Sequence, residues 1–224
     1  MPAKSNHRAA FTSDPQFIAR LAKQGLGPTG EPLNRESVPS AAPSLPVQVD
    51  KPQSKATARL AKVRVANMDG RLDTLVFDPV TGSLYIALPG AILLGLNVML
   101  RLHHAKGTAL KATWRKRIEA LSIEQKSEMA RWLKAASYPI IVEEVYVTPE
   151  NNLLDTESVA ASCKGIIDAL VVCGFLPDDS LSYISHPIAF TERGSRPGLY
   201  LRLKPSPKPW GLIDDSTMAW VRGH

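Results

Sequence analysis

The segment from Asp155 to Leu170 constrains the fold of this chain more than any other, because its charged and apolar residues alternate with the period of an α-helix. Glu157, Lys164 and Asp168 recur at a spacing that places them on one helix face. The opposite side is expected to pack against a core and consists of Val159, Cys163, Ile166, Ile167 and Leu170. Asp155 or Thr156 is expected to cap the start of the helix, and Gly174 its end.

Stretches with the pattern of β-strands lie on both sides of this helix. Residues 139–147 precede it, residues 198–203 follow it, and residues 75–77 and 83–88 form two earlier strands around a turn. A helix is expected over 105–136, interrupted at Ser122, where the sequence Ser-Ile-Glu-Gln fits a capping box. Because strands and helices alternate, we expect an α/β or α+β domain with a small mixed β-sheet packed against helices.

The distribution of proline divides the chain of 224 residues into one domain and two arms. Residues 27–57 are rich in proline and serine and are expected to be a linker. The arm before it, residues 1–26, contains a short helix candidate over 13–25. The domain is expected over 58–204, followed by an extended C-terminal arm over 205–224, where prolines recur.

Charge is distributed unevenly along the chain, whose formal net charge is +6. Residues 140–185 carry eight acidic residues and a single cation, Lys164, whereas residues 97–134 carry nine Lys or Arg and three Glu. A cluster of carboxylates repels itself unless a cation holds it together, and a basic surround attracts polyanions such as nucleic acid. The pattern indicates metal-dependent chemistry on a phosphate backbone.

The acidic segment resembles the core motif of the RusA-type Holliday junction resolvases, endodeoxyribonucleases common in phages and prophages. That motif reads Asp-x-Asp-Asn, then a helix carrying a lysine and Asp-Ala-Leu or Asp-Gly-Leu, then a hydrophobic turn ending in Asp-Asp. The corresponding residues here are Asp155-Thr-Glu157-Ser158, Lys164, Asp168-Ala-Leu170 and Gly174-Phe-Leu-Pro-Asp178-Asp179. Upstream, residues 96–106 are similar to the family's early Leu-Asn, Arg and His segment, so the resemblance covers roughly residues 83–204.

The resemblance implies a Mg²⁺-dependent, structure-selective endonuclease that cleaves four-way DNA junctions in recombination and repair. Asp155, Glu157 and Asp179 would be the ligands of Mg²⁺, with Mn²⁺ as a possible substitute, and Lys164 would stabilise the phosphate in the transition state. These four residues form the expected catalytic set. The family also implies a homodimer that places two active sites on branched DNA.

Basic residues near the middle of the chain are the expected DNA contacts, because cations bind phosphates regardless of sequence. Together with one amide from the segment that resembles the family, the predicted set is Asn97, Arg101, Lys106, Lys111, Arg115 and Lys116.

Other interpretations of the same residues stay open at this point. Asp155 alone fits a helix cap, Lys164 and Asp168 fit an i, i+4 surface pair, and Asp178-Asp179 fits a solvated turn. Glu157 stands where the family has its second Asp, and Ser158 where it has Asn. These departures motivate an alternative function, a non-catalytic DNA-binding protein with a RusA-like fold. A third possibility is an interaction module built on the terminal arms.

Several classes of protein do not fit the sequence. No Gly-rich phosphate loop is present, so no nucleotide cofactor is expected. The start of the chain leads into no long apolar run, and the apolar stretch over 87–100 is broken by Pro89, Gly90 and Gly95, so neither a secretory signal nor a membrane span is expected. The cysteines, Cys163 and Cys173, lie on the same predicted helix and cannot readily pair. A reducing compartment and a cytoplasmic location are therefore expected.

Overall fold

The computed structural model describes Ala19, Lys23 and residues 55–223. The two isolated positions are helical, while the rest of the helix predicted over 13–25 and most of the predicted linker over 27–57 lie outside the described residues. The chain divides into two units, Met1–Asp50 and Lys51–His224, so the fold described below belongs to the second unit. The domain start predicted at residue 58 falls inside a helix, α2, that begins at Lys55.

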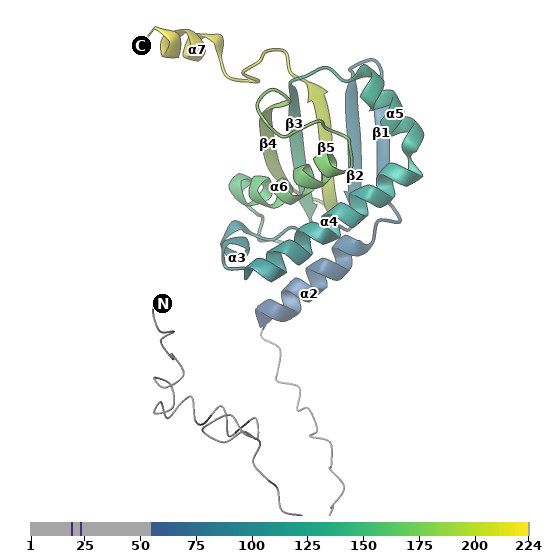
Figure 1. Cartoon of the computed structure of the whole chain (residues 1–224). Coiled ribbons are helices and arrows are strands. Elements are labelled where there is room, and N and C mark those ends of the chain that lie inside the picture. The colour runs from purple at the N-terminus through teal and green to yellow at the C-terminus, as the bar shows by residue number, and fades with distance from the viewer. Residues whose placement is uncertain (1–18, 20–22, 24–54, 224) are drawn as a thin grey trace, which may run out of the picture. The chain divides into compact units, whose positions relative to one another are not determined.

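A mixed five-stranded β-sheet forms the centre of the second unit (Figure 1). In chain order its strands are β1 (Thr74–Asp78), β2 (Ser83–Pro89), β3 (Ile140–Thr148), β4 (Ile184–Arg193) and β5 (Gly198–Pro205). They lie side by side in the order β1-β2-β5-β3-β4, and β3 and β4 are the parallel pair in an otherwise antiparallel sheet. The predicted α+β class with a small mixed sheet is confirmed.

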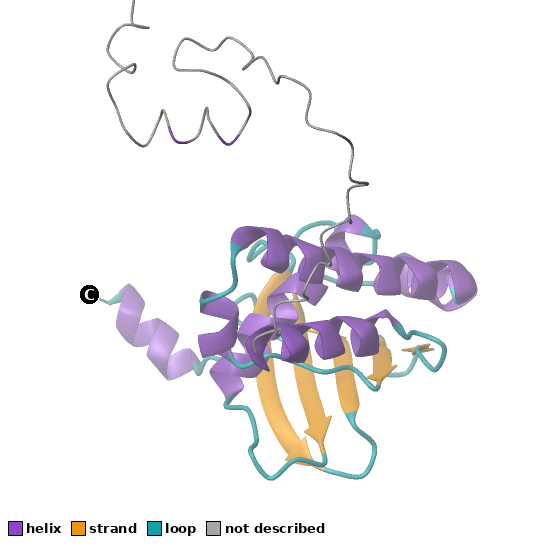
Figure 2. Cartoon of the chain, turned by 90° about the horizontal axis from the view of Figure 1, so that it is seen from below, coloured by secondary structure: helices purple, strands orange, loops and turns teal. Residues whose placement is uncertain are grey.

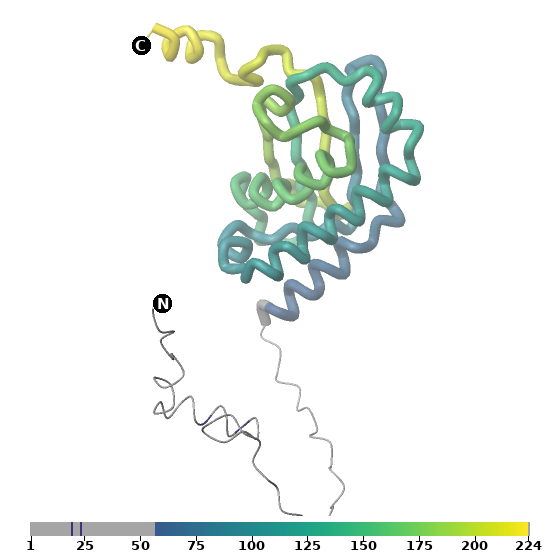
Figure 3. The backbone as a smooth tube through the Cα atoms, in the orientation of Figure 1, coloured from purple at the N-terminus to yellow at the C-terminus, as the bar shows by residue number. Residues whose placement is uncertain are grey.

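The described helices are α2 (Lys55–Met68), α3 (Leu96–Leu100), α4 (His104–Glu124), α5 (Lys126–Ala135), α6 (Thr156–Val172) and α7 (Asp215–Arg222). Helices α2 to α6 gather on one face of the sheet, and α7 extends away from it at the C-terminal end (Figure 2). Helix α4 packs on α6, and α2 runs alongside α4, as the backbone trace in Figure 3 shows. Leu60 and Val63 of α2 are buried with Leu94 in a small cluster that attaches α2 to the domain.

Helix α6 packs as its sequence predicts. The expected core residues are all at most 6% exposed; they are Val159, Cys163, Ile166, Ile167 and Leu170. The helix ends at Val172, two residues before Gly174, whose φ of 80° suits a residue without a side chain. The N–H of Phe175 then donates to the carbonyl of Leu170 at 2.9 Å, which satisfies a helix-end carbonyl. Fully burying each Ile or Leu side chain contributes about 1.5–3 kcal/mol, so α6 is a principal part of the core.

The predicted interruption of the long helix at Ser122 is wrong by three residues, because α4 ends at Glu124 and α5 begins at Lys126. The Ser122 hydroxyl donates to the carbonyl of Glu119 at 2.7 Å and caps nothing. Gln125 lies at the break instead, where the backbone N–H of Leu75 donates to its Oε1 at 2.8 Å and its Nε2 donates to the carbonyl of Asp73 at 3.0 Å. The break thus joins the helices to the edge strand β1.

The extended arm predicted over 205–224 is also corrected, since α7 occupies part of it. The side chain of Asp214 caps this helix by accepting from the N–H of Ser216 at 2.8 Å, and the Arg222 guanidinium lies 4.8 Å from the ring of Trp210. Strand β4 was missed because it is an edge strand, so its half-exposed residues do not alternate cleanly between apolar and polar.

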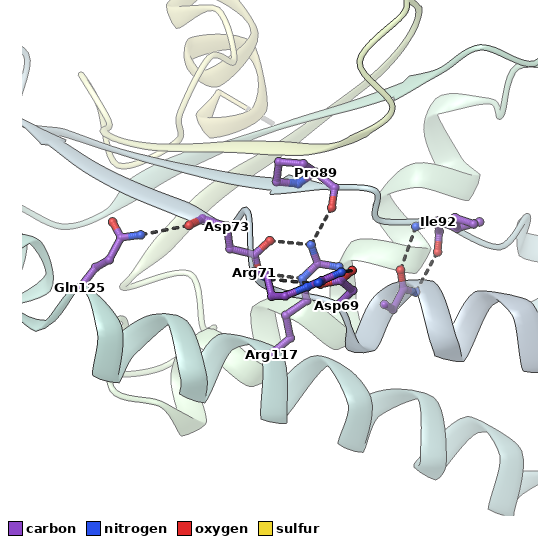
Figure 4. A network of polar contacts seen from close by, with 8 residues as sticks. Asp69, Arg71, Asp73, Pro89, Ile92, Arg117 and Gln125 are labelled. Atoms are coloured by element: carbon purple, nitrogen blue, oxygen red, sulfur yellow. Dashed lines mark hydrogen bonds and ion pairs between the residues drawn. The ribbon is translucent and has the colours of Figure 1, made fainter.

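A buried ion pair fixes α4 against the start of the sheet (Figure 4). The Arg117 guanidinium donates through Nε to Asp73 at 2.7 Å and through Nη2 to the carbonyl of Pro89 at 2.9 Å. Arg117 and Asp73 are both almost fully buried, so each charge depends on the other for compensation. Arg117 is therefore structural, and its buried charge is not available as one of the phosphate contacts expected of this basic stretch.

Candidate functional site

The start of α6 uses two motif residues for structure. The carboxylate of Asp155 accepts a hydrogen bond from the N–H of Ser158 at 2.6 Å, and this bond holds the pKa of Asp155 below its usual value. The Ser158 hydroxyl is buried and accepts from the N–H of Leu96 at 3.0 Å, which ties α3 to α6. The capping role considered for Asp155 is confirmed, and Ser158 has a packing role.

The other charged motif residues form a chain of ion pairs along α6. Lys164 contacts Asp168 one turn later at 2.9 Å and also pairs with Asp179 from the turn after the helix. Asp168 in turn accepts from Lys111 of α4 at 2.9 Å. This chain of four residues, Lys111, Asp168, Lys164 and Asp179, is called the ion ladder below. It carries two positive and two negative charges, so it is neutral as a whole.

The ladder also sets the ionisation of its members. The hydrogen bond to Asp179 raises the pKa of Lys164, so the ammonium stays charged. Burial raises the pKa of Asp168, but the hydrogen bonds from Lys164 and Lys111 outweigh it and hold this pKa below its usual value. Lys164 and Asp179 therefore meet in the form of an ion pair.

The predicted Mg²⁺ ligands do not converge in this arrangement. Among residues 55–223 no group of three or more His, Cys, Asp or Glu side chains is placed to hold a metal ion. Asp155 caps the start of α6 and Glu157 lies in its first turn, whereas Asp179 is paired with Lys164. At 1.5 Å per residue, the Cα of Lys164 lies about 13 Å further along the helix axis than the Cα of Asp155. As placed, the three carboxylates do not fit a common cation, and their role as ligands stays a prediction.

Glu144 on β3 is a feature that the sequence analysis did not single out. It is 1% exposed, faces α6, and its Oε2 finds no hydrogen-bond partner within the described part of the chain. Burial raises the pKa of Glu144 to about 7, while a hydrogen bond with Cys163 has a smaller, opposite effect. Its neighbour Glu143 points to the other face and pairs with Lys204 and Arg202. The sequence signal was available, since Glu144 alternates with Val142 and Tyr146 and so shares their inward side of the strand.

The predicted DNA contacts are all exposed or half-buried, but they do not form one stripe. Lys111 and Arg115 are one turn apart on the side of α4 near α6, and Lys116 lies about 140° around the helix from Lys111. Asn97 and Arg101 belong to α3 and its C-cap, and Lys106 lies near the start of α4. Helix α2 adds cations that sequence reasoning missed, since Arg59, Lys62 and Arg64 are all exposed there.

Comparison with known proteins adds no assignment: neither the scan against family models nor the search of curated proteins finds a match for this chain. None of the described helices combines the length and the apolar character needed to cross a bilayer.

Proposed function

We propose that this protein binds branched DNA through a basic surface formed by α2 and α4. The observation that carries the proposal is that these two helices lie alongside each other and both expose cations. Helix α2 contains no acidic residue at all. The basic surface comprises Arg59, Lys62, Arg64, Lys106, Lys111, Arg115 and Lys116. Two adjacent basic helices offer several phosphate contacts at once, which is the main source of affinity for DNA of any sequence.

The salt dependence of binding tests this proposal. Replacing Lys111, Arg115 and Lys116 with Ala leaves up to three phosphates without a cation, so the slope of log K against log salt is expected to flatten by about 0.9 for each of those phosphates. The matched control replaces Lys126 and Lys134, exposed cations on α5, and is expected to leave the slope unchanged. Fluorescence anisotropy on a labelled four-way junction gives both slopes. Equal slopes for the triple variant and the parent protein would place DNA elsewhere.

A second candidate function is Mg²⁺-dependent endonuclease activity on four-way junctions. It is favoured by the meeting of Lys164 with Asp179, two residues that both match positions of the motif which the sequence resembles. It requires DNA or the cation to draw Asp179 away from Lys164 and toward Asp155 and Glu157. Nicking of a synthetic junction in Mg²⁺ or Mn²⁺, abolished by Asp179→Asn, would establish the activity. Binding without nicking in either metal would leave the non-catalytic function.

We also propose that the protein is a homodimer that packs through the outer face of the sheet. The register places Val76, Tyr85, Arg202, Glu143 and Ile188 side by side across the strands on the face away from the helices. Val76 is 53% exposed and Phe190, two residues beyond Ile188, is 57% exposed. Large apolar side chains are thus exposed at both edges of this face, with the paired charges of Arg202 and Glu143 between them, and exposed apolar side chains of this size are typical of an interface. Light scattering is expected to give the mass of a dimer, and Phe190→Glu that of a monomer.

A further inference from the structure

A pocket of about 300 Å³ lies between β3, α6 and the turn that leads into β4. Its apolar walls come from Val142, Ile167, Leu181 and Ile184. Its polar lining includes Glu144, Lys164 and Asp179. A predominantly apolar hollow with a few polar groups is the usual form of a site for a small planar ligand.

Glu144 gives this pocket a specific chemistry. An unpartnered polar atom inside a protein costs about 1–3 kcal/mol, and Oε2 of Glu144 has no partner among residues 55–223 to offset that cost. A protonated carboxyl presents one donor and one acceptor next to each other. The complementary ligand therefore carries an acceptor beside an N–H donor on one edge, as nucleobases do.

The ion ladder makes a charged ligand unfavourable in this pocket and favours a ligand that is part of DNA. Lys164 is already paired with two carboxylates, so it has little attraction left for a phosphate entering the pocket. The same ladder connects the pocket, through Asp168, to Lys111 on α4. DNA held on the basic surface would thus pass close to the mouth of the pocket.

We infer that this pocket receives a single nucleobase turned out of the DNA stack, with its edge on the carboxyl of Glu144. The inference rests on the proposed DNA-binding function and identifies the pocket as the site that recognises a base of the bound DNA. Apolar walls replace the stacking that an extruded base loses, and hydrogen bonds to one edge replace its pairing. The unpaired or strained bases at a branch point are the easiest to extrude, because less pairing has to be broken.

A four-way junction carrying 2-aminopurine at the branch point tests this inference, because the fluorescence of this base rises when it leaves the stack. Saturating this DNA with the full-length protein is expected to raise the emission several-fold. Leu181→Trp enlarges a lining side chain that is 80% exposed, so it is expected to obstruct entry to the pocket without altering the core and to abolish the rise. Glu144→Leu is expected to lower affinity for this junction about tenfold, whereas Glu192→Gln, an exposed acidic control on β4, is expected to change neither quantity.

The outcomes separate this inference from the proposed function. Tight binding with no emission change, or an unchanged rise in Leu181→Trp, would overturn the base pocket and leave DNA binding in place. If the protein binds no DNA, the proposed function fails, and the pocket is titrated with free 2-aminopurine deoxynucleoside instead. Saturable binding that Leu181→Trp abolishes would support the pocket, and absence of binding would overturn it.

Discussion

At the scale of the residue, Glu144 makes the stability of the fold depend on pH. Its pKa is about 7 in the folded protein against a usual 4.5. Below about pH 4.5 the folded and unfolded chains both hold the proton. As pH rises toward 7 the unfolded chain releases the proton and the folded chain keeps it, so unfolding becomes easier. Above about pH 7 both states are ionised, and the stabilisation is fully lost.

We expect Glu144→Gln to remove this dependence. Each pKa unit of difference between the folded and unfolded chains corresponds to about 1.36 kcal/mol. Between pH 4.5 and 7 the unfolding free energy of the parent protein is therefore expected to fall by about 3 kcal/mol relative to that of the variant. Urea unfolding of both proteins at several pH values measures this difference. The contributions of the other titrating groups cancel in it, because the two proteins share those groups. Parallel curves for the two proteins would show that Glu144 ionises normally in the fold.

Asp155 offers a test that separates its capping role from its charge. Asn caps a helix about as well as Asp, while Ala costs about 1 kcal/mol. We expect Asp155→Asn to keep the melting temperature and Asp155→Ala to lower it. If the protein is an endonuclease, both variants lose cleavage, since both lack the carboxylate. Thermal melts and junction nicking on the same pair distinguish the two roles, and full nicking by Asp155→Asn would remove Asp155 from the predicted ligands.

At the scale of the element, α2 is expected to contribute both stability and DNA affinity. Leu60 is 7% exposed and joins α2 to the domain, whereas Val65 on the same helix is 71% exposed. We expect Leu60→Ala to lower the unfolding free energy by about 2–3 kcal/mol and to weaken DNA binding, because the cations of α2 lose their support. Val65→Ala is the control, with a change within about 0.5 kcal/mol. Equal effects of the two changes would mean that α2 does not pack as described.

At the scale of the whole molecule, the division between Asp50 and Lys51 predicts where the chain can be shortened. A protein that begins at Lys51 retains α2 and is expected to melt cooperatively at the temperature of the full chain. A protein that begins at Asp69 lacks α2, exposes Leu94, and is expected to melt lower. Circular dichroism of the two proteins provides the comparison. Loss of cooperative melting in the protein that begins at Lys51 would show that the first 50 residues support the fold.

The sequence by itself determined the elements whose residues repeat with a clear period. Helix α6, with its buried side, its start at a cap formed by Asp155 or Thr156 and its end before Gly174, follows from spacing and capping chemistry alone, because these are local interactions. The pairing of Lys164 with Asp168 was open to the same reasoning, as they are one turn apart. Strand β4 escaped it, since its half-exposed residues do not alternate cleanly, and helix α7 escaped it, since the prolines that precede it favoured an extended arm.

Only the tertiary structure decided which distant residues meet. The register of β3 turns Glu144 toward α6 and Glu143 away from it, although they are adjacent in the sequence. The turn after α6 brings Asp179 to Lys164 rather than to Asp155 and Glu157, and the packing of α4 on α6 adds Lys111 to the ladder. Such contacts depend on how whole elements pack, and the local patterns that specify a helix or a strand do not encode that packing.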